Sequence, residues 1–239
     1  MTTADRWTRT VREQLGLGRF LPLGDARDGA WIAERAARDV LLSVAAGLPG
    51  VRLEHLRIAP AEPDEAAEPV VPPPPSALPP APLRVTADLA ATASEPLPAT
   101  AARVRATLAE AAALRMGLVV SDVDLRVTAL LDAAPEPAAP DERAAGEHDG
   151  KPAGDGDEGR AGRAALAVTG VTRLTGTLGR PVHFSEPPAE AVLPRRHVRV
   201  ECAVGADLRT VEVARRIRAA VSEALPDHPT VAVLVTAVG

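Results

Sequence analysis

The stretch Val198-Arg-Val-Glu-Cys-Ala-Val204 opens the part of the chain that decides the fold, residues 198–239. Apolar residues alternate in it as they do in a strand with one buried face. Residues 211–225 then place apolar side chains at helical spacing, and residues 230–238 are rich in valine, which favours a strand. This part of the sequence therefore predicts a strand, a helix and a second strand.

An earlier part of the chain repeats this order. A strand pattern over residues 83–90 is followed by a helical pattern over residues 101–111 and by a second strand pattern over residues 123–129. A helical pattern and a Gly-Val corner precede each copy, at Gly50-Val51 and Gly170-Val171. The sequence therefore predicts an α+β, two-layer fold of two repeated αββαβ units, each a small mixed sheet with helices packed on one face.

These patterns divide the chain into four segments. Residues 1–24 are expected to form an amphipathic arm, which packs on the first domain, docks on a partner or lies on a membrane surface. Residues 25–131 form the first domain, with a Pro-rich, extended insertion at residues 60–82, and residues 158–239 form the second. Residues 132–157 have the composition of a disordered acidic linker.

The segment that enters the first domain has two parts. Residues 17–23 form an extended apolar stretch that another element must cover. Asp28 then stands where an N-cap would precede a helix over residues 30–47, whose apolar side chains form one stripe. A strand over residues 51–58 is expected next, with a break in its alternation at Glu54-His55.

Composition favours a cytoplasmic protein. The formal net charge is -5, and Lys151 is the only lysine; the bias to Arg, Ala and Pro indicates a GC-rich genome, such as that of an actinobacterium. The single cysteine, Cys202, lies in a strand pattern, so we expect a buried thiol in a reducing compartment. No apolar run approaches the ~20 residues of a membrane span, and the charged amino terminus argues against a signal peptide.

The chain carries no pattern typical of a catalytic, cofactor or metal site. Gly16-Leu-Gly18 and Gly176-Thr-Leu-Gly179 are too short for phosphate loops. The histidines are scattered at spacings that do not suit a metal on one helix: His55, His148, His183, His197 and His228. We therefore expect a protein that is not an enzyme, without catalytic, cofactor-binding or metal-binding residues.

Arginines supply the best basic patch, and we take them as the candidate partner-binding face: Arg195, Arg196, Arg199, Arg215, Arg216 and Arg218. A solvated surface is the simplest interpretation of such a group, and an acidic partner, an anionic membrane or RNA are the others. The near absence of aromatic residues removes the stacking platform that binding of single-stranded nucleic acid usually uses, so nucleic acid is the weaker expectation.

The order helix, Gly-Val corner, strand pair, helix and Val-rich strand resembles the alkaline shock protein family of the envelope stress response. The resemblance is clearest in the second copy, at Gly170-Val171, residues 198–204, Val211-Glu-Val-Ala-Arg-Arg-Ile217 and residues 231–238. The first copy is similar at residues 49–51, 83–89, 101–111 and 123–129. The chain departs from the family in its Pro-rich insertion and in Ala203-Val-Gly-Ala206, which lacks the family's aromatic and acidic residues. It also resembles an uncharacterised streptomycete group whose label, taken from a nucleopolyhedrovirus protein, implies no function.

The resemblance to alkaline shock proteins implies a non-enzymatic scaffold without cofactors, which gathers near the membrane through an integral-membrane partner and supports envelope homeostasis. An RNA- or nucleoid-associated adaptor that uses the arginines of the second domain is the alternative. Small units of this kind leave an exposed sheet face and an unpaired edge, so self-association is also expected, between the copies or between chains. In that arrangement Val85, Leu89, Val104 and Leu108 take positions equivalent to Val200, Val204, Ile217 and Val221.

Overall fold

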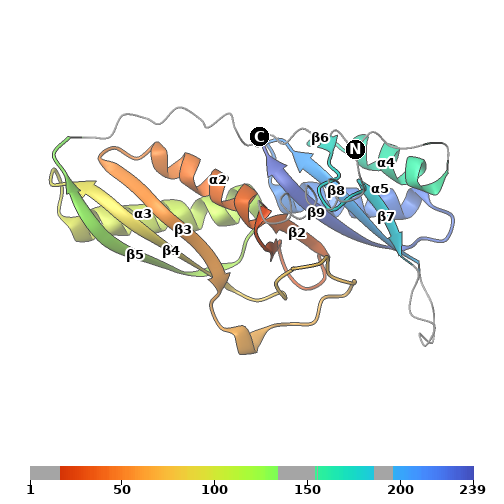
Figure 1. Cartoon of the computed structure of the whole chain (residues 1–239), viewed down its shortest axis with the longest axis horizontal. Coiled ribbons are helices and arrows are strands. Elements are labelled where there is room, and N and C mark those ends of the chain that lie inside the picture. Colours follow the sequence, from red (N-terminus) through yellow and green to blue (C-terminus); the bar gives the residue numbers. More distant parts are fainter. Residues whose placement is uncertain (1–16, 134–153, 155, 186–195) are drawn as a thin grey trace, which may run out of the picture. The chain divides into compact units, whose positions relative to one another are not determined.

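The structure is a computed structural model of the chain, and it describes residues 17–133, 154, 156–185 and 196–239. These residues form an α+β fold with two mixed sheets, one of six strands and one of three (Figure 1). They divide into two compact units. Unit 1 holds the described residues of 17–36, 67–80 and 154–239, and unit 2 holds residues 37–66 and 81–133. No helix among the described residues has both the length and the apolar character that crossing a bilayer takes.

Unit 2 contains the three-stranded sheet, in the order β3-β4-β5. Strand β3 pairs antiparallel with β4, and β5 pairs parallel with β4 after the crossover through α3. The elements are α2 (Glu34–Ala46, in unit 2 from Ala37 onward), β3 (Val51–Pro60), β4 (Leu83–Thr92), α3 (Leu97–Ala111) and β5 (Val120–Leu131). Helix α3 continues into a π-helical turn, Ala112–Met116, and ends at Gly117, whose φ of 90° is left-handed. The core between sheet and helices includes Val85, Leu89, Val104 and Leu108, all fully buried.

Unit 1 contains the six-stranded sheet. Strand β8 lies inside it, with β9 parallel on one side and β6 and β7 antiparallel on the other. The elements are β1 (Phe20–Pro22), β2 (Ala30–Ala33), α4 (Asp157–Leu166), β6 (Val171–Leu174), β7 (Val182–Ser185), β8 (His197–Val204), α5 (Thr210–Ala224) and β9 (Thr230–Val238). Helix α5 buries Val213, Ile217 and Val221 together with Val200 and Val204 of β8.

The start of the first helix corrects the sequence prediction. Residues 30–33 form strand β2 instead of the first turn of a helix, and the helix begins at Glu34. Strand β2 pairs parallel with β9 and antiparallel with β1, which buries Trp31 and Ile32 almost completely. Long-range pairing therefore overrides the local helical pattern. Asp28 is not a helix cap, because its carboxylate is bound by Arg215.

The units also divide the chain differently from the expected domain boundaries. Residues 25–36 and 67–80 lie in the same unit as the C-terminal sheet and not with strands β3 to β5. The Pro-rich segment is held there by backbone bonds, since Phe20 N donates to Ser76 O at 3.2 Å and Leu78 N donates to Phe20 O at 2.8 Å. Trp31 Nε1 lies 3.4 Å from Leu78 O. Part of the Pro-rich insertion thus pairs with the extended apolar segment at residues 17–23. Most of the expected arm (residues 1–24) and linker (residues 132–157) lies outside the described residues.

Both units place a strand, a crossover helix and a parallel strand in the same order, with an antiparallel strand beside the first. The tandem duplication nevertheless stays a prediction. The two sheets differ in their number of strands, and they differ at one edge: β9 is followed in its sheet by β2, whereas β5 ends its sheet.

Candidate functional site

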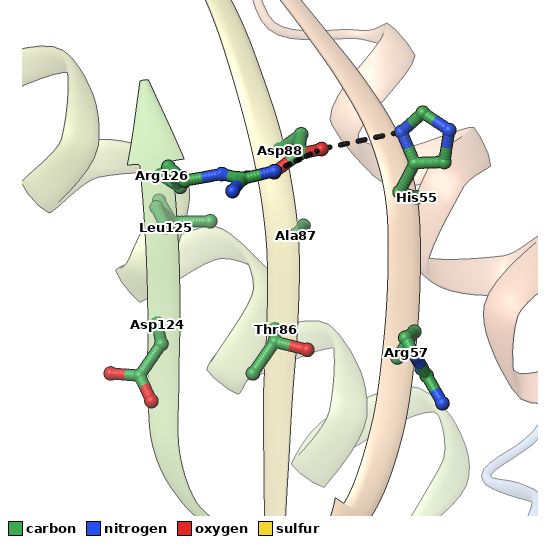
Figure 2. A pocket seen from close by; sticks show the side chains of 8 residues that line it. All are labelled: His55, Arg57, Thr86, Ala87, Asp88, Asp124, Leu125 and Arg126. Carbon is green, nitrogen blue, oxygen red and sulfur yellow. Dashed lines mark hydrogen bonds and ion pairs between the residues drawn. The ribbon is translucent and has the colours of Figure 1, made fainter. Parts of the chain in front are cut away.

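One face of the three-stranded sheet is covered by helices, and the other carries most of the charged side chains of its strands. Strand residues point alternately to the two faces, so the buried Leu83, Val85, Ala87 and Leu89 leave their neighbours on the opposite face. Figure 2 shows Thr86 and Asp88 of this face on β4, with the helices behind the strands. We call this surface the charged sheet face and define it as His55, Arg57, Arg84, Thr86, Asp88, Asp122, Asp124 and Arg126.

Asp88 lies at the centre of a three-residue ionic cluster. Arg126 donates two hydrogen bonds to its carboxylate, from Nε to Oδ1 at 3.0 Å and from Nη2 to Oδ2 at 3.2 Å. His55 Nδ1 lies 3.3 Å from Oδ2 on the other side. The pKa of Asp88 is lowered, first by the hydrogen bond from Arg126, so this carboxylate stays ionised over the physiological range. The pair is set by register, because Asp88 and Arg126 are direct partners across β4 and β5.

His55 reaches this cluster through a β-bulge. The register of β3 against β4 shifts between Glu54 and Arg57, and His55 has a left-handed φ of 49°. Bulges redirect a side chain in this way. The expected break in the alternation at Glu54-His55 is confirmed by this bulge. The side chain of His55 remains 77% exposed, so it is accessible to a partner.

A second ionic group lies beside the first. Arg84 places Nη2 3.5 Å from Asp122 and Nε 3.5 Å from Asp124. Between the two groups the surface forms an open hollow of about 590 Å³, which Arg57 and Thr86 also line (Figure 2). Charges of both signs therefore alternate over the face.

Asp88 is not suited to act as a general acid. A general acid must carry a proton near neutral pH, whereas Asp88 is held ionised by Arg126. No described group of three or more His, Cys, Asp and Glu side chains is placed to hold a metal ion. The face carries charges of both signs, joined in ion pairs.

Unit 1 has a buried carboxyl in the middle of β8. Glu201 is fully buried, and the connection between β6 and β7 covers it: Leu178 N donates to Oε2 at 3.0 Å. Arg199 Nη2 lies 3.2 Å from Oε1 as an ion pair without hydrogen-bond geometry. Burial raises the pKa of Glu201 to about 7. Nearby His197 is kept neutral, since burial, with Arg199 and His183, lowers its pKa to about 4.

The arginines of the predicted partner-binding face do not share one surface. Arg195 lies outside the described residues. Arg196 binds Asp227 and Asp157, with three hydrogen bonds of 2.7–2.9 Å, and stacks over Phe184. Arg199 alternates with Val200, which packs toward α5, so Arg199 lies on the other face of the sheet from the arginines of that helix. Of the three arginines on α5, Arg215 and Arg216 are exposed and Arg218 is half-buried.

Arg215 and Arg218 of α5 bind Arg27 and Asp28, which lie between β1 and β2. Arg215 donates to both carboxylate oxygens of Asp28, at 2.6 and 2.9 Å. Arg218 donates to the carbonyl oxygens of Asp28, of Arg27 at 2.7 Å and of Val231 at 3.1 Å. Burial alone would raise the pKa of Asp28, but the hydrogen bond from Arg215 and the other interactions outweigh it and lower that pKa. These two side chains thus link the turn at residues 27–28 to α5 within unit 1.

Sequence reasoning missed the charged sheet face and Glu201. The signal for the face was present, because Arg84, Thr86 and Asp88 recur at the period of a strand, as do Asp122, Asp124 and Arg126. Cys202 is buried as expected, and burial raises the pKa of its thiol to about 12. Comparisons of the chain with protein-family models, with curated proteins and with solved structures found no match.

Proposed function

We propose that this chain is a non-enzymatic protein-binding scaffold of the alkaline-shock-like type, and that it acts through protein contacts near the cell membrane. The charged sheet face is the observation that carries the binding role. The location near a membrane and the link to envelope stress are supported by the resemblance of the strand, helix and corner motifs.

The charged sheet face has the properties of a recognition surface. Its side chains project from paired strands, so their positions are fixed before a partner arrives. The side chain of Asp88 is only partly exposed, whereas those of His55, Arg126 and Asp124 are largely exposed. A partner with complementary charges would gain specificity from such a pattern more than raw affinity.

The alternative, an RNA- or nucleoid-associated adaptor, has less support. Nucleic-acid binding needs several cations that are free to neutralise phosphates. Arg196 and Arg215 are paired with carboxylates, and Arg218 is bonded to backbone carbonyls. Because their donors are already engaged, these three side chains offer less to a phosphate backbone than free arginines would.

The test is affinity capture from membrane extracts with the full chain. Thr86→Arg places a large cation in the centre of the hollow, at an exposed position of β4, and should remove the captured partner. Thr172→Arg makes the same change at an exposed threonine of β6 in unit 1 and should keep it. Equal capture by the two variants would refute binding through this face. A partner that nuclease treatment removes would favour the adaptor.

A further inference from the structure

Strand β5 ends the three-stranded sheet with an open edge. It runs for twelve residues, and no strand among the described residues pairs with its outer side. In the six-stranded sheet the corresponding strand, β9, is followed by β2. An edge of this length presents a row of backbone groups, which natural proteins cover or pair. Arg105 of α3 donates from Nε to one of them, Val123 O, at 3.0 Å, and a pairing strand would take its place there.

Apolar side chains accompany this edge on its helix side. Val127 pairs with Leu89 and Leu130 with Ala91, so both lie on the face that the helices cover. They are nevertheless 41% and 63% exposed, because the layer of helices does not extend past the edge. A further strand with its own helix layer would bury them.

The charges of β5 are complementary about one residue. Asp124 and Arg126 flank Leu125, and both point to the charged sheet face. If a second β5 pairs antiparallel with Leu125 opposite Leu125, each Asp124 lies opposite an Arg126 and each Val123 opposite a Val127. Opposite charges and apolar pairs at directly facing positions both stabilise a sheet.

The symmetry of this pairing also preserves the layers. A two-fold axis perpendicular to the sheet, midway between the two facing Leu125 residues, keeps the helices of both copies on one face and both charged sheet faces on the other. Charged residues on an edge strand can serve to keep other chains away. Opposite charges at directly facing positions, in contrast, favour pairing. Here opposite signs face each other about Leu125. Asp124 and Arg126 also pair within their own sheet, with Arg84 and Asp88, so each facing pair extends an existing ion pair across the edge.

We propose that β5 is a self-association edge, at which two copies of this chain pair antiparallel about Leu125 to form a continuous six-stranded sheet. The inference goes beyond the proposed partner binding and does not depend on it, because Thr86 lies on β4 and away from the edge. A pairing through one strand buries little surface, so the dimer is expected to be weak and concentration-dependent.

Sedimentation of the full chain over a concentration series tests the pairing. The wild type should dimerise, and Asp124→Arg should weaken the dimer about ten- to thirtyfold, because two attractive pairs become repulsive. Asp122→Arg is the matched control: it removes a carboxylate beside the same Arg84 but faces Thr128 in this register, so it should change the affinity much less. The proposal would be overturned if the wild type is monomeric, as it would be when another segment of its own chain covers the edge. Equal effects of the two variants would overturn it as well.

Cysteine cross-linking tests the register and does not need a charge reversal to fold. The only native cysteine, Cys202, is buried, so introduced thiols report alone. Facing Cα atoms of an antiparallel pair are about 4.5–5.5 Å apart, which lies within the range of a disulfide. Leu125→Cys should therefore oxidise to a covalent dimer. Thr128→Cys should not, because its two copies would be about 20 Å apart. Cross-linking at position 128 as efficient as at 125 would exclude this register.

Discussion

Glu201→Gln should change how the stability of unit 1 depends on pH. The pKa of Glu201 rises from its usual 4.5 to about 7 on folding because the side chain is fully buried. The folded state then holds a proton that the unfolded state releases. This contribution to stability is fully present below about pH 4.5 and is lost as the pH rises through about 7.

The size of the effect follows from the shift. A rise of about 2.5 pKa units corresponds to about 3 kcal/mol between the protonated and ionised limits. Glutamine keeps an oxygen that can accept the hydrogen bond of Leu178 N and stays neutral at every pH. The variant should therefore match the wild type near pH 4, begin to exceed it by pH 5, and exceed it by about 3 kcal/mol above pH 8.

Urea unfolding at a series of pH values measures this difference. A Trp7→Phe background leaves Trp31, buried in β2 of the same sheet, as the sole tryptophan and therefore as a probe of unit 1. Glu223→Gln, on the exposed side of α5, is the control and should follow the wild type. A difference between Glu201→Gln and wild type that stays constant over this range would refute the assignment of a neutral buried acid.

Two further substitutions test the packing of each unit. Asp28→Asn should destabilise unit 1 by about 1–3 kcal/mol because it breaks the two-bond pair with Arg215. Asp207→Asn, at an exposed turn, is the control and should have little effect. Trp31 fluorescence during urea unfolding measures both variants. Leu108→Ala should destabilise unit 2 by about 2–5 kcal/mol through the cavity that it leaves. Leu130→Ala, at an exposed position, should cost less than about 0.5 kcal/mol. Amide hydrogen exchange in β4 distinguishes the two variants, and equal protection would contradict the assigned core.

The strand and helix patterns of the sequence identified the elements that local periodicity determines. Residues 198–204 and 83–90 alternate because one face of each strand meets a helix, and both strands form where expected. The pairing of Asp88 with Arg126 needed more than periodicity. It depends on the register of β4 against β5, which includes a shift at each end, and no local pattern specifies such shifts.

The arginines of α5 show that charge pairing between distant segments is not visible in a local sequence pattern. A helix that carries Arg215, Arg216 and Arg218 resembles an exposed basic surface as long as the rest of the chain is treated separately. Asp28, which neutralises Arg215, lies 187 residues away in the sequence. Charge pairing at such separation follows from the tertiary arrangement, so the sequence alone could not tell a binding surface from an internal attachment.

The difference between β9 and β5 was nevertheless visible in their residues. Residues 231–235 of β9 are apolar at every position and all buried, as in a strand that is covered on both faces and paired on both edges. Such a strand requires a neighbour on each side. Residues 30–33 supply it as β2, although their local pattern had predicted the start of a helix. Strand β5 instead alternates Asp122, Asp124 and Arg126 with apolar residues, as a strand with one solvated face does. Strand β2 thus completes the six-stranded sheet from within the chain. In the three-stranded sheet, the charges about Leu125 are complementary to those of a second copy, which we propose as the neighbour of β5.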